Sequence, residues 1–258
     1  MKILYTFIIC FVAGIGAGLG TGFAGMSAAA VISPMLITFL HMEPYDAVGI
    51  ALASDVLASA VSAYTYGKNK NLDIKNGVPM MLAVLVFTVV GSFVSSLVPG
   101  STMGSFSVIM TLLLGIKFIL KPVMTTRETM DAVDPKKRLL RSILCGAGIG
   151  FICGFIGAGG GMMMLLILTS VLGFELKTAV GTSVFIMTFT AFTGAVSHFS
   201  IGGAPDVLSL IFCIASTLLW ARIAARFANR ATPAVLNRAT GVVLVILGAL
   251  ILSVHMLS

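Results

Sequence analysis

The sequence predicts an all-α polytopic membrane protein built from two inverted repeats of about five helical segments each. Three observations support this class. Of the 258 residues, 58% are hydrophobic and only 10% are charged, whereas a soluble domain carries about a quarter charged residues. Long apolar segments follow one another along nearly the whole chain, so lipid is the solvent that suits their side chains. The third observation is an internal repeat.

The repeat becomes visible when the chain is displaced along itself by 132 residues. Five glycines of the first half then fall on five of the second, namely Gly14, Gly16, Gly18, Gly22 and Gly25 on Gly146, Gly148, Gly150, Gly154 and Gly157. Ala47-Val48-Gly49 falls on Ala179-Val180-Gly181 without a gap. We therefore predict a first transmembrane repeat over 1–121, a cytoplasmic linker over 122–138 and a second repeat over 139–258. Duplicated halves of this size are typical of secondary transporters.

Each half contains about five apolar segments. They lie at 3–24, 26–40, 44–67, 77–98 and 102–120, then at 139–157, 160–172, 177–199, 206–221 and 234–256. The second segment of each half is shorter than the roughly 20 residues that span the hydrocarbon core. We expect these two segments to be Gly-rich broken or re-entrant helices, which are tolerated only where the backbone is buried in protein or lines a cavity.

The basic residues predict the orientation. They gather in three stretches: Lys68, Lys70 and Lys75; Lys117, Lys121, Arg127, Lys136, Lys137, Arg138 and Arg141; and Arg222, Arg226, Arg230 and Arg238. Cytoplasmic loops carry the excess of Lys and Arg, so we expect all three stretches on the cytoplasmic face of the inner (plasma) membrane and both termini outside. Two arrangements stay open: every segment crosses, or the first two segments of each half form a hairpin that does not cross.

The same composition argues against other classes. The net charge of +7 falls in these stretches and is not spread over one surface, so no nucleic-acid partner is expected. The four cysteines lie in apolar segments without metal-ligand spacing and are interpreted as packed thiols. We find no HExxH, GxSxG or nucleotide-binding motif, so neither an enzyme nor a cofactor is expected. The apolar start after Met1 is not interpreted as a signal peptide, because the repeat beginning at Gly14 needs the helix before it.

Two kinds of glycine motif follow from the repeat. The stripes Gly14, Gly18, Gly22 and Gly146, Gly150, Gly154 have the spacing of four that lets helices approach closely in lipid. The strings Gly25-Met26-Ser27 and Gly157-Ala158-Gly159-Gly160-Gly161 precede new apolar segments. A helix that starts at such a turn points free N–H groups at whatever lies there, which favours an anion. A plain turn is the alternative interpretation.

These motifs resemble those of the TauE/SafE family of membrane permeases, also called the sulfite exporter or toluene sulfonate uptake permease family. The residues that carry the resemblance are Gly22-Phe23-Ala24-Gly25 with Pro34, Gly154-Phe155-Ile156-Gly157-Ala158-Gly159-Gly160-Gly161, Ala179-Val180-Gly181-Thr182-Ser183 and Gly194-Ala195-Val196-Ser197-His198. The resemblance covers nearly the whole chain. It implies a permease or exporter of small organosulfur or sulfur oxyanions such as sulfite, sulfonates or sulfoacetate. The first half has Ser27-Ala28-Ala29 where the second has Gly159-Gly160-Gly161, so we expect unequal half-sites.

We expect the anion to bind where the two glycine breaks meet near the midplane. Backbone N–H groups there would hold it, with hydroxyl groups assisting; the candidate binding residues are Gly25, Met26, Ser27, Gly157, Gly159, Gly160, Gly161, Thr182 and Ser183. No Lys or Arg falls within these segments, so neutral donors would carry recognition. The lipid bilayer and a small anion are the expected partners, and a homo-oligomer is left open.

Four further residues are candidates for coupling or gating. Asp55 lies near the middle of segment 44–67, where an acid is a functional candidate by default; proton or cation coupling and a structural hydrogen bond are both open. Glu43 and Glu175 occupy equivalent places before a helix, where a capping role competes with a gate. His198 lies at a segment end, where an interfacial role is the alternative. An anion channel and a carboxylate transporter are the competing functions.

Overall fold

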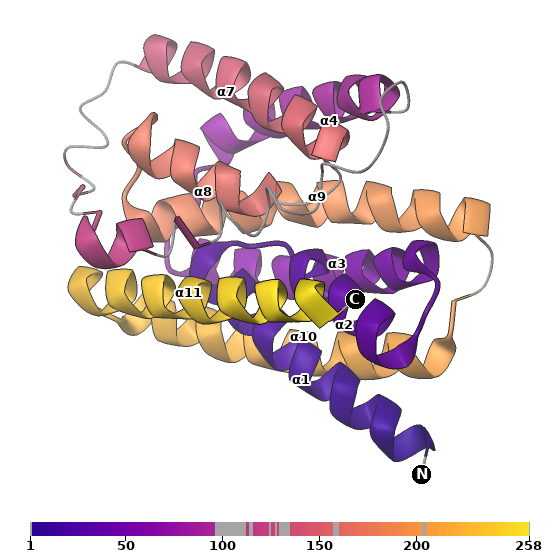
Figure 1. The fold of residues 1–258 in the computed structure, drawn as a ribbon. Coiled ribbons are helices and arrows are strands. Elements are labelled where there is room, and N and C mark those ends of the chain that lie inside the picture. The colour runs from indigo at the N-terminus through magenta and orange to yellow at the C-terminus, as the bar shows by residue number, and fades with distance from the viewer. Residues whose placement is uncertain are drawn as a thin grey trace.

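The structure is a computed structural model that describes residues 2–95, 112–113, 116–123, 125–126, 128, 135–156, 160–202 and 205–257. Throughout these residues the regular secondary structure is helical. The helices are α1 (Lys2–Ala24), α2 (Ala29–Leu40), α3 (Pro44–Lys68), α4 (Ile74–Ser95), α7 (Pro135–Ile156), α8 (Gly160–Ser170), α9 (Leu176–Gly202), α10 (Val207–Arg230) and α11 (Pro233–Leu257). Most of them run along a common direction, with α4 and α7 forming one side of the bundle (Figure 1).

Five helices in the described part of the chain are long and apolar enough to cross a membrane. They are Ile3–Ala24, Pro44–Lys68, Leu176–Ser200, Val207–Arg230 and Pro233–Ser253. Large apolar side chains such as Leu57, Val89 and Ile246 are exposed on the outside of the bundle, as expected where lipid replaces water. The predicted all-α polytopic membrane class is therefore confirmed.

The first helix of each half packs on the fourth helix of the other half through its glycine stripe. A β-carbon on Gly18 would lie 2.7 Å from the backbone nitrogen of Ala221 in α10. One on Gly150 of α7 would lie 2.4 Å from the carbonyl oxygen of Val84 in α4. Only glycine permits backbones to approach this closely, so the predicted packing role is confirmed for the first stripe and for Gly146 and Gly150 of the second. The inverted arrangement of the two halves in the membrane stays a prediction.

The third helices of the two halves, α3 and α9, pack on each other in opposite directions. Gly49 near the start of α3 contacts Phe199 near the end of α9, and Gly181 near the start of α9 lies against Asn71 just beyond α3. This antiparallel pair is one of the extensive contacts between the halves, beside those of α4 with α7 and of α1 with α10. It places the middle of α3, with Asp55, inside the bundle.

Helix α2 is a short return helix. Its 12 residues span about 18 Å, less than the roughly 30 Å of a hydrocarbon core. It runs back beside α1: the Tyr5 hydroxyl at the start of α1 donates to the carbonyl of Phe39 near the end of α2, at 3.1 Å. The predicted broken segment is therefore present in the first half.

The described parts of the three basic stretches lie toward one end of the bundle (Figure 1). The side chain of Asn71, after α3, donates to Asn229 near the end of α10 at 2.7 Å, and Lys177 at the start of α9 donates to the Asn229 carbonyl at 3.0 Å. Val123 pairs with Asn237 of α11 at 2.7 and 2.9 Å. This grouping agrees with a shared side for the basic stretches, and its assignment to the cytoplasm stays a prediction.

Several helix boundaries differ from those predicted, most of all those of α10 and α7. Helix α10 continues to Arg230, although segment 206–221 was expected to end at Ala221 and the arginines after it were expected in a loop. Alanines such as Ala224, Ala225 and Ala228 favour helix and are buried, so α10 persists until the residues before Pro233. Helix α7 likewise starts at Pro135 rather than at 139.

Candidate functional site

The break between α1 and α2 is a left-handed turn at Gly25. Its φ is +60°, a conformation that glycine adopts without steric cost. The Gly25 amide donates to the Thr21 carbonyl at 3.0 Å, and the Met26 amide donates to the Gly20 carbonyl at 3.2 Å. These bonds close the end of α1, and Met26 is fully buried. The chain then reverses and enters α2.

Side chains from three helices hold this turn in place. The Tyr66 hydroxyl of α3 donates to the Gly22 carbonyl at 2.8 Å, and the Thr240 hydroxyl of α11 donates to the Phe23 carbonyl at 3.1 Å. Thr21 donates to the Met26 carbonyl at 2.9 Å. Carbonyls in the last turn of a helix have no partner within the helix, so the Tyr66 and Thr240 hydroxyls satisfy those of Gly22 and Phe23. Sequence reasoning did not identify Thr240, although a hydroxyl within an apolar segment was a usable signal.

The start of α2 faces the carboxylate of Asp55. Ser27 donates to Oδ2 of Asp55 at 2.6 Å, and Ser59, one turn along α3, donates to Oδ1 at 2.8 Å. The Ala29 amide donates to the Ser27 hydroxyl at 3.3 Å. Asp55 is fully buried. The donors at the α2 start, predicted to bind a substrate, therefore surround an acid of the protein itself.

This arrangement suits a negative charge. The first turn of a helix carries partial positive charge, and Ser27 and Ser59 add two hydroxyl donors. Ser62, seven residues after Asp55 and on the same face of α3, is fully buried, and its hydroxyl has no hydrogen-bond partner among the described residues. Such a group retains its capacity to bind a further polar ligand.

The two hydroxyl residues predicted on α9 face different neighbours. Ser183 lies against Gly25 and donates to the Val180 carbonyl at 2.9 Å. Thr182 instead accepts a hydrogen bond from the Asp73 amide at 3.2 Å, before the start of α4. Adjacent residues on a helix project about 100° apart, so only Ser183 is brought to the first break. Thr182 is placed at the junction between α9 and α4.

The second glycine break lies largely outside the described residues. Gly157 and Gly159 fall there, so their predicted role is a proposal from sequence. Gly160 and Gly161 are the first two residues of α8, which agrees with a helix start after the glycine run.

The remaining candidates lie away from Asp55. Glu43 directly precedes α3, and its side chain makes no capping hydrogen bond; its carbonyl accepts from Ala47 at 3.0 Å, as that of Glu175 accepts from Ala179 at 2.8 Å. The ring of His198 stacks against Tyr45 at 4.3 Å between centroids, and Nδ1 lies 3.2 Å from the Tyr45 carbonyl. Glu43 and His198 therefore lie at the end of α3 opposite the basic stretches.

Comparisons with known proteins place these features in context. The family described as sulfite exporter TauE/SafE matches residues 10–251. The probable membrane transporter protein YunE of Bacillus subtilis is 28% identical over 75% of this chain and 78% of the relative. The corresponding values for the probable membrane transporter protein YdhB of the same organism are 24%, 91% and 96%. A probable membrane transporter protein of Methanocaldococcus jannaschii, MJ0441, is 30% identical over 59% of this chain and 55% of its own. No solved structure matches.

Proposed function

The chain belongs to the TauE/SafE family, and on that premise we propose that it is a secondary transporter of small organosulfur or sulfur oxyanions, such as sulfite, sulfonates or sulfoacetate. Family membership and five span-length apolar helices support a multi-pass membrane transporter. The sulfur-anion substrate class and the coupling mechanism described below go beyond family membership and are proposed here.

One observation carries the mechanism. The carboxylate of Asp55 lies at the start of α2 and accepts hydrogen bonds from Ser27 and Ser59. A sulfonate or sulfite oxygen needs the same neutral donors. An ionised Asp55 would repel such an anion at close range, particularly where water is excluded. Binding of the anion therefore requires that Asp55 be protonated or moved away.

Protonation provides a simple coupling scheme. A proton on Asp55 removes the repulsion, and the acid becomes a donor. The Ser27 hydroxyl, which donates to Asp55 in the structure, is then free to donate to the anion, beside the partial positive charge of the α2 start. A monovalent anion and a proton together carry no net charge, which lowers the electrostatic cost of crossing the bilayer. Movement of one repeat against the other would then expose the site to the second side.

Glu43 and His198 lie at the end of α3 opposite the basic stretches, and they fit a role separate from that of Asp55. Glu43 is exposed and His198 is half-buried, and neither contacts Asp55. If they take part in transport, they act at an entrance, as gating residues, and the Asp55 site acts in coupling.

Flux measurements test this function. The purified protein is reconstituted in liposomes, and uptake of labelled sulfite, sulfoacetate, a small alkylsulfonate and a short carboxylate is compared. Saturable uptake and counterflow of a sulfur oxyanion are expected. Linear flux without counterflow would support an anion channel, and preference for the carboxylate would support a carboxylate transporter. Absence of flux for every sulfur anion, with folded protein in the vesicles, would overturn the proposal.

A further inference from the structure

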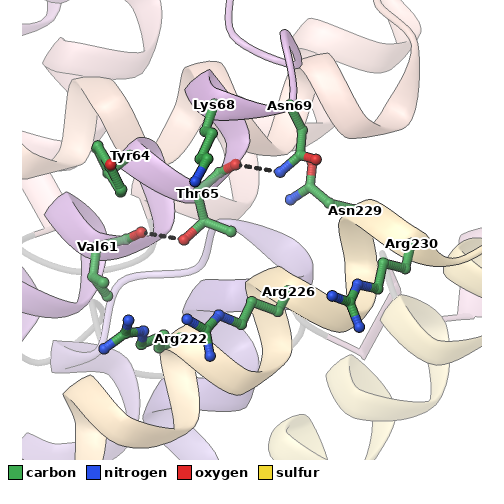
Figure 2. A pocket seen from close by; sticks show the side chains of 9 residues that line it. All are labelled: Val61, Tyr64, Thr65, Lys68, Asn69, Arg222, Arg226, Asn229 and Arg230. Carbon is green, nitrogen blue, oxygen red and sulfur yellow. Dashed lines mark hydrogen bonds between the residues drawn. The ribbon is translucent and has the colours of Figure 1, made fainter.

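A basic cavity opens between the C-terminal ends of α3 and α10. Its volume is about 870 Å³, within the range of ligand pockets. It is lined by Val61, Tyr64, Thr65, Lys68 and Asn69 of the α3 end and by Arg222, Arg226, Asn229 and Arg230 of α10 (Figure 2). These residues belong to neither glycine break, so the cavity is separate from the site at Asp55.

The three arginines form a ridge along α10. They are four residues apart, so they lie on one side of the helix and rise by about 6 Å at each step. Lys68 faces them from α3 (Figure 2). The lining residues include no Asp or Glu. No ion pair of these four cations is found within the described ranges, so no carboxylate offsets the repulsion between their positive charges.

Three neutral polar side chains of the cavity, those of Thr65, Asn69 and Asn229, are already engaged by the protein. Thr65 donates to the Val61 carbonyl at 2.7 Å and Asn69 donates to the Thr65 carbonyl at 2.7 Å. The Asn229 amide donates to the Ala225 carbonyl, also at 2.7 Å. These bonds fix the walls of the cavity and leave the guanidinium and ammonium groups, with the Tyr64 hydroxyl at the edge, as its available donors.

Topology and helix dipoles do not account for this convergence. A cation in the last turn of a helix is stabilised by the dipole, which covers Lys68 and Arg230. Arg222 lies two turns before the end of α10, beyond the reach of that effect. The rule that basic residues face the cytoplasm explains why they lie at one end of the bundle. It does not explain why four of them surround one cavity.

The cavity borders the lipid-facing surface. Tyr64, at its edge, is 72% exposed, and Leu219 and Ile223 next to Arg222 are also exposed. Tyrosine is enriched where a membrane protein crosses from hydrocarbon to headgroups. The position is therefore accessible both from water and from the headgroup layer of the bilayer.

We propose that this cavity binds an oxyanion of the phosphate or sulfonate type, held by Arg222, Arg226 and Arg230 with Lys68 opposite. Arginine binds such groups through two parallel N–H donors, and a series of guanidinium groups along one ridge suits a group with several charged oxygens. Two sources supply this chemistry: a dissolved oxyanion and the headgroup of an anionic phospholipid. The inference does not depend on the transported substrate.

Binding measurements on the full-length chain test the proposal. Inorganic phosphate and sulfate are titrated onto protein in phosphatidylcholine nanodiscs, and retention of phosphatidylglycerol against phosphatidylcholine is measured by native mass spectrometry. The double variant Arg222→Gln, Arg226→Gln should weaken one of these two interactions by about tenfold or more, since each lost charge-assisted bond contributes strongly. Arg238→Gln, at the same end of the bundle but outside the cavity, is the matched control and should bind as the parent does.

The two arms identify the source. Loss of phosphate or sulfate binding alone indicates a dissolved ligand, and loss of phosphatidylglycerol retention alone indicates a lipid headgroup. The proposal is overturned if the parent binds neither, or if the double variant binds both as tightly as the parent. Lys68→Gln, at an exposed position, repeats the test if the double variant does not fold.

Discussion

Gly25 and Ser183 are in such close contact that a β-carbon at position 25 would lie 1.9 Å from the Ser183 hydroxyl oxygen. Gly25 also has a φ of +60°, which other residues rarely adopt. Both features select glycine, but for different reasons. The contact with Ser183 depends on α9, whereas the positive φ depends on the backbone of residue 25 alone. Two substitutions can therefore separate their contributions to stability.

Gly25→Ala should lower the stability of the protein by about 1–2 kcal/mol from the left-handed backbone, with a further loss from overlap with Ser183. Adding Ser183→Gly to Gly25→Ala should restore only the stability lost through overlap with Ser183, and not the loss from the left-handed backbone. Thermal unfolding of purified protein in detergent measures both, with Ser183→Gly alone as the control. Equal stability of Gly25→Ala and the parent would contradict the turn. Gly25→Leu would therefore strain the fold as well as fill a site, so it is a poor test of anion binding.

The packing of the second stripe predicts opposite effects at two glycines of α7. A β-carbon on Gly150 would lie 2.4 Å from the Val84 carbonyl, whereas one on Gly148 would meet nothing within 4 Å. Gly150→Ala should destabilise the protein by about 1–3 kcal/mol because α4 and α7 must separate. Gly148→Ala should be neutral or stabilise it by up to about 1 kcal/mol, since alanine favours helix. Thermal unfolding of the two variants should show opposite or clearly unequal shifts.

The close helix packing at the glycine stripes and the turn at Gly25 could be predicted from the sequence, because both depend on local spacing. Glycines four apart indicate close helix packing, and the glycine at 25 indicates a turn, whichever helix lies opposite. The contact between Ser27 and Asp55 was not predictable, because it joins residues 28 positions apart through the packing of α2 on α3. The end of α10 was misplaced because arginines suggested a loop, while the buried alanine face between them favoured helix.

The bond from Tyr66 to the α1 turn predicts a strong effect from one oxygen atom. Tyr66→Phe would leave the buried Gly22 carbonyl without its donor at 2.8 Å, which should cost about 1–3 kcal/mol of stability. Tyr64→Phe, two residues earlier and 72% exposed, should change stability little. Unfolding curves in the same detergent compare the two. Equal losses in both variants would indicate a general tyrosine effect and not this hydrogen bond.

Cysteine labelling tests the orientation of the basic end. In a chain with its four native cysteines replaced, Lys70→Cys, Arg138→Cys and Arg230→Cys should resist a membrane-impermeant thiol reagent added to intact cells. Glu43→Cys, at the opposite end of α3, should react. Permeabilised cells supply the control, since all four positions should then be labelled. Modification of one basic position but not the others in intact cells would refute a shared cytoplasmic side for the basic stretches.

Asp55→Asn tests the proposed coupling. Asparagine keeps the size of the side chain and still accepts a hydrogen bond from Ser27, but it carries no charge at any pH and cannot release a proton. Uptake driven by an acidic exterior should therefore be lost, because the proton no longer moves with the anion. Exchange of labelled for unlabelled anion at equal pH should continue, since it needs the neutral site but no net proton movement.

Ser59→Ala is the matched control for Asp55→Asn. It removes one donor to the same carboxylate, at 2.8 Å, and keeps the acid that titrates, so its uptake should still respond to pH even if the rate falls. Both variants are measured in liposomes with and without an imposed pH gradient, at equal protein content. Loss of gradient-driven uptake in Asp55→Asn with retained exchange supports coupling through this acid. Unchanged pH dependence would leave Asp55 with a structural role, as the hydrogen-bonded acid that fixes the start of α2 on α3.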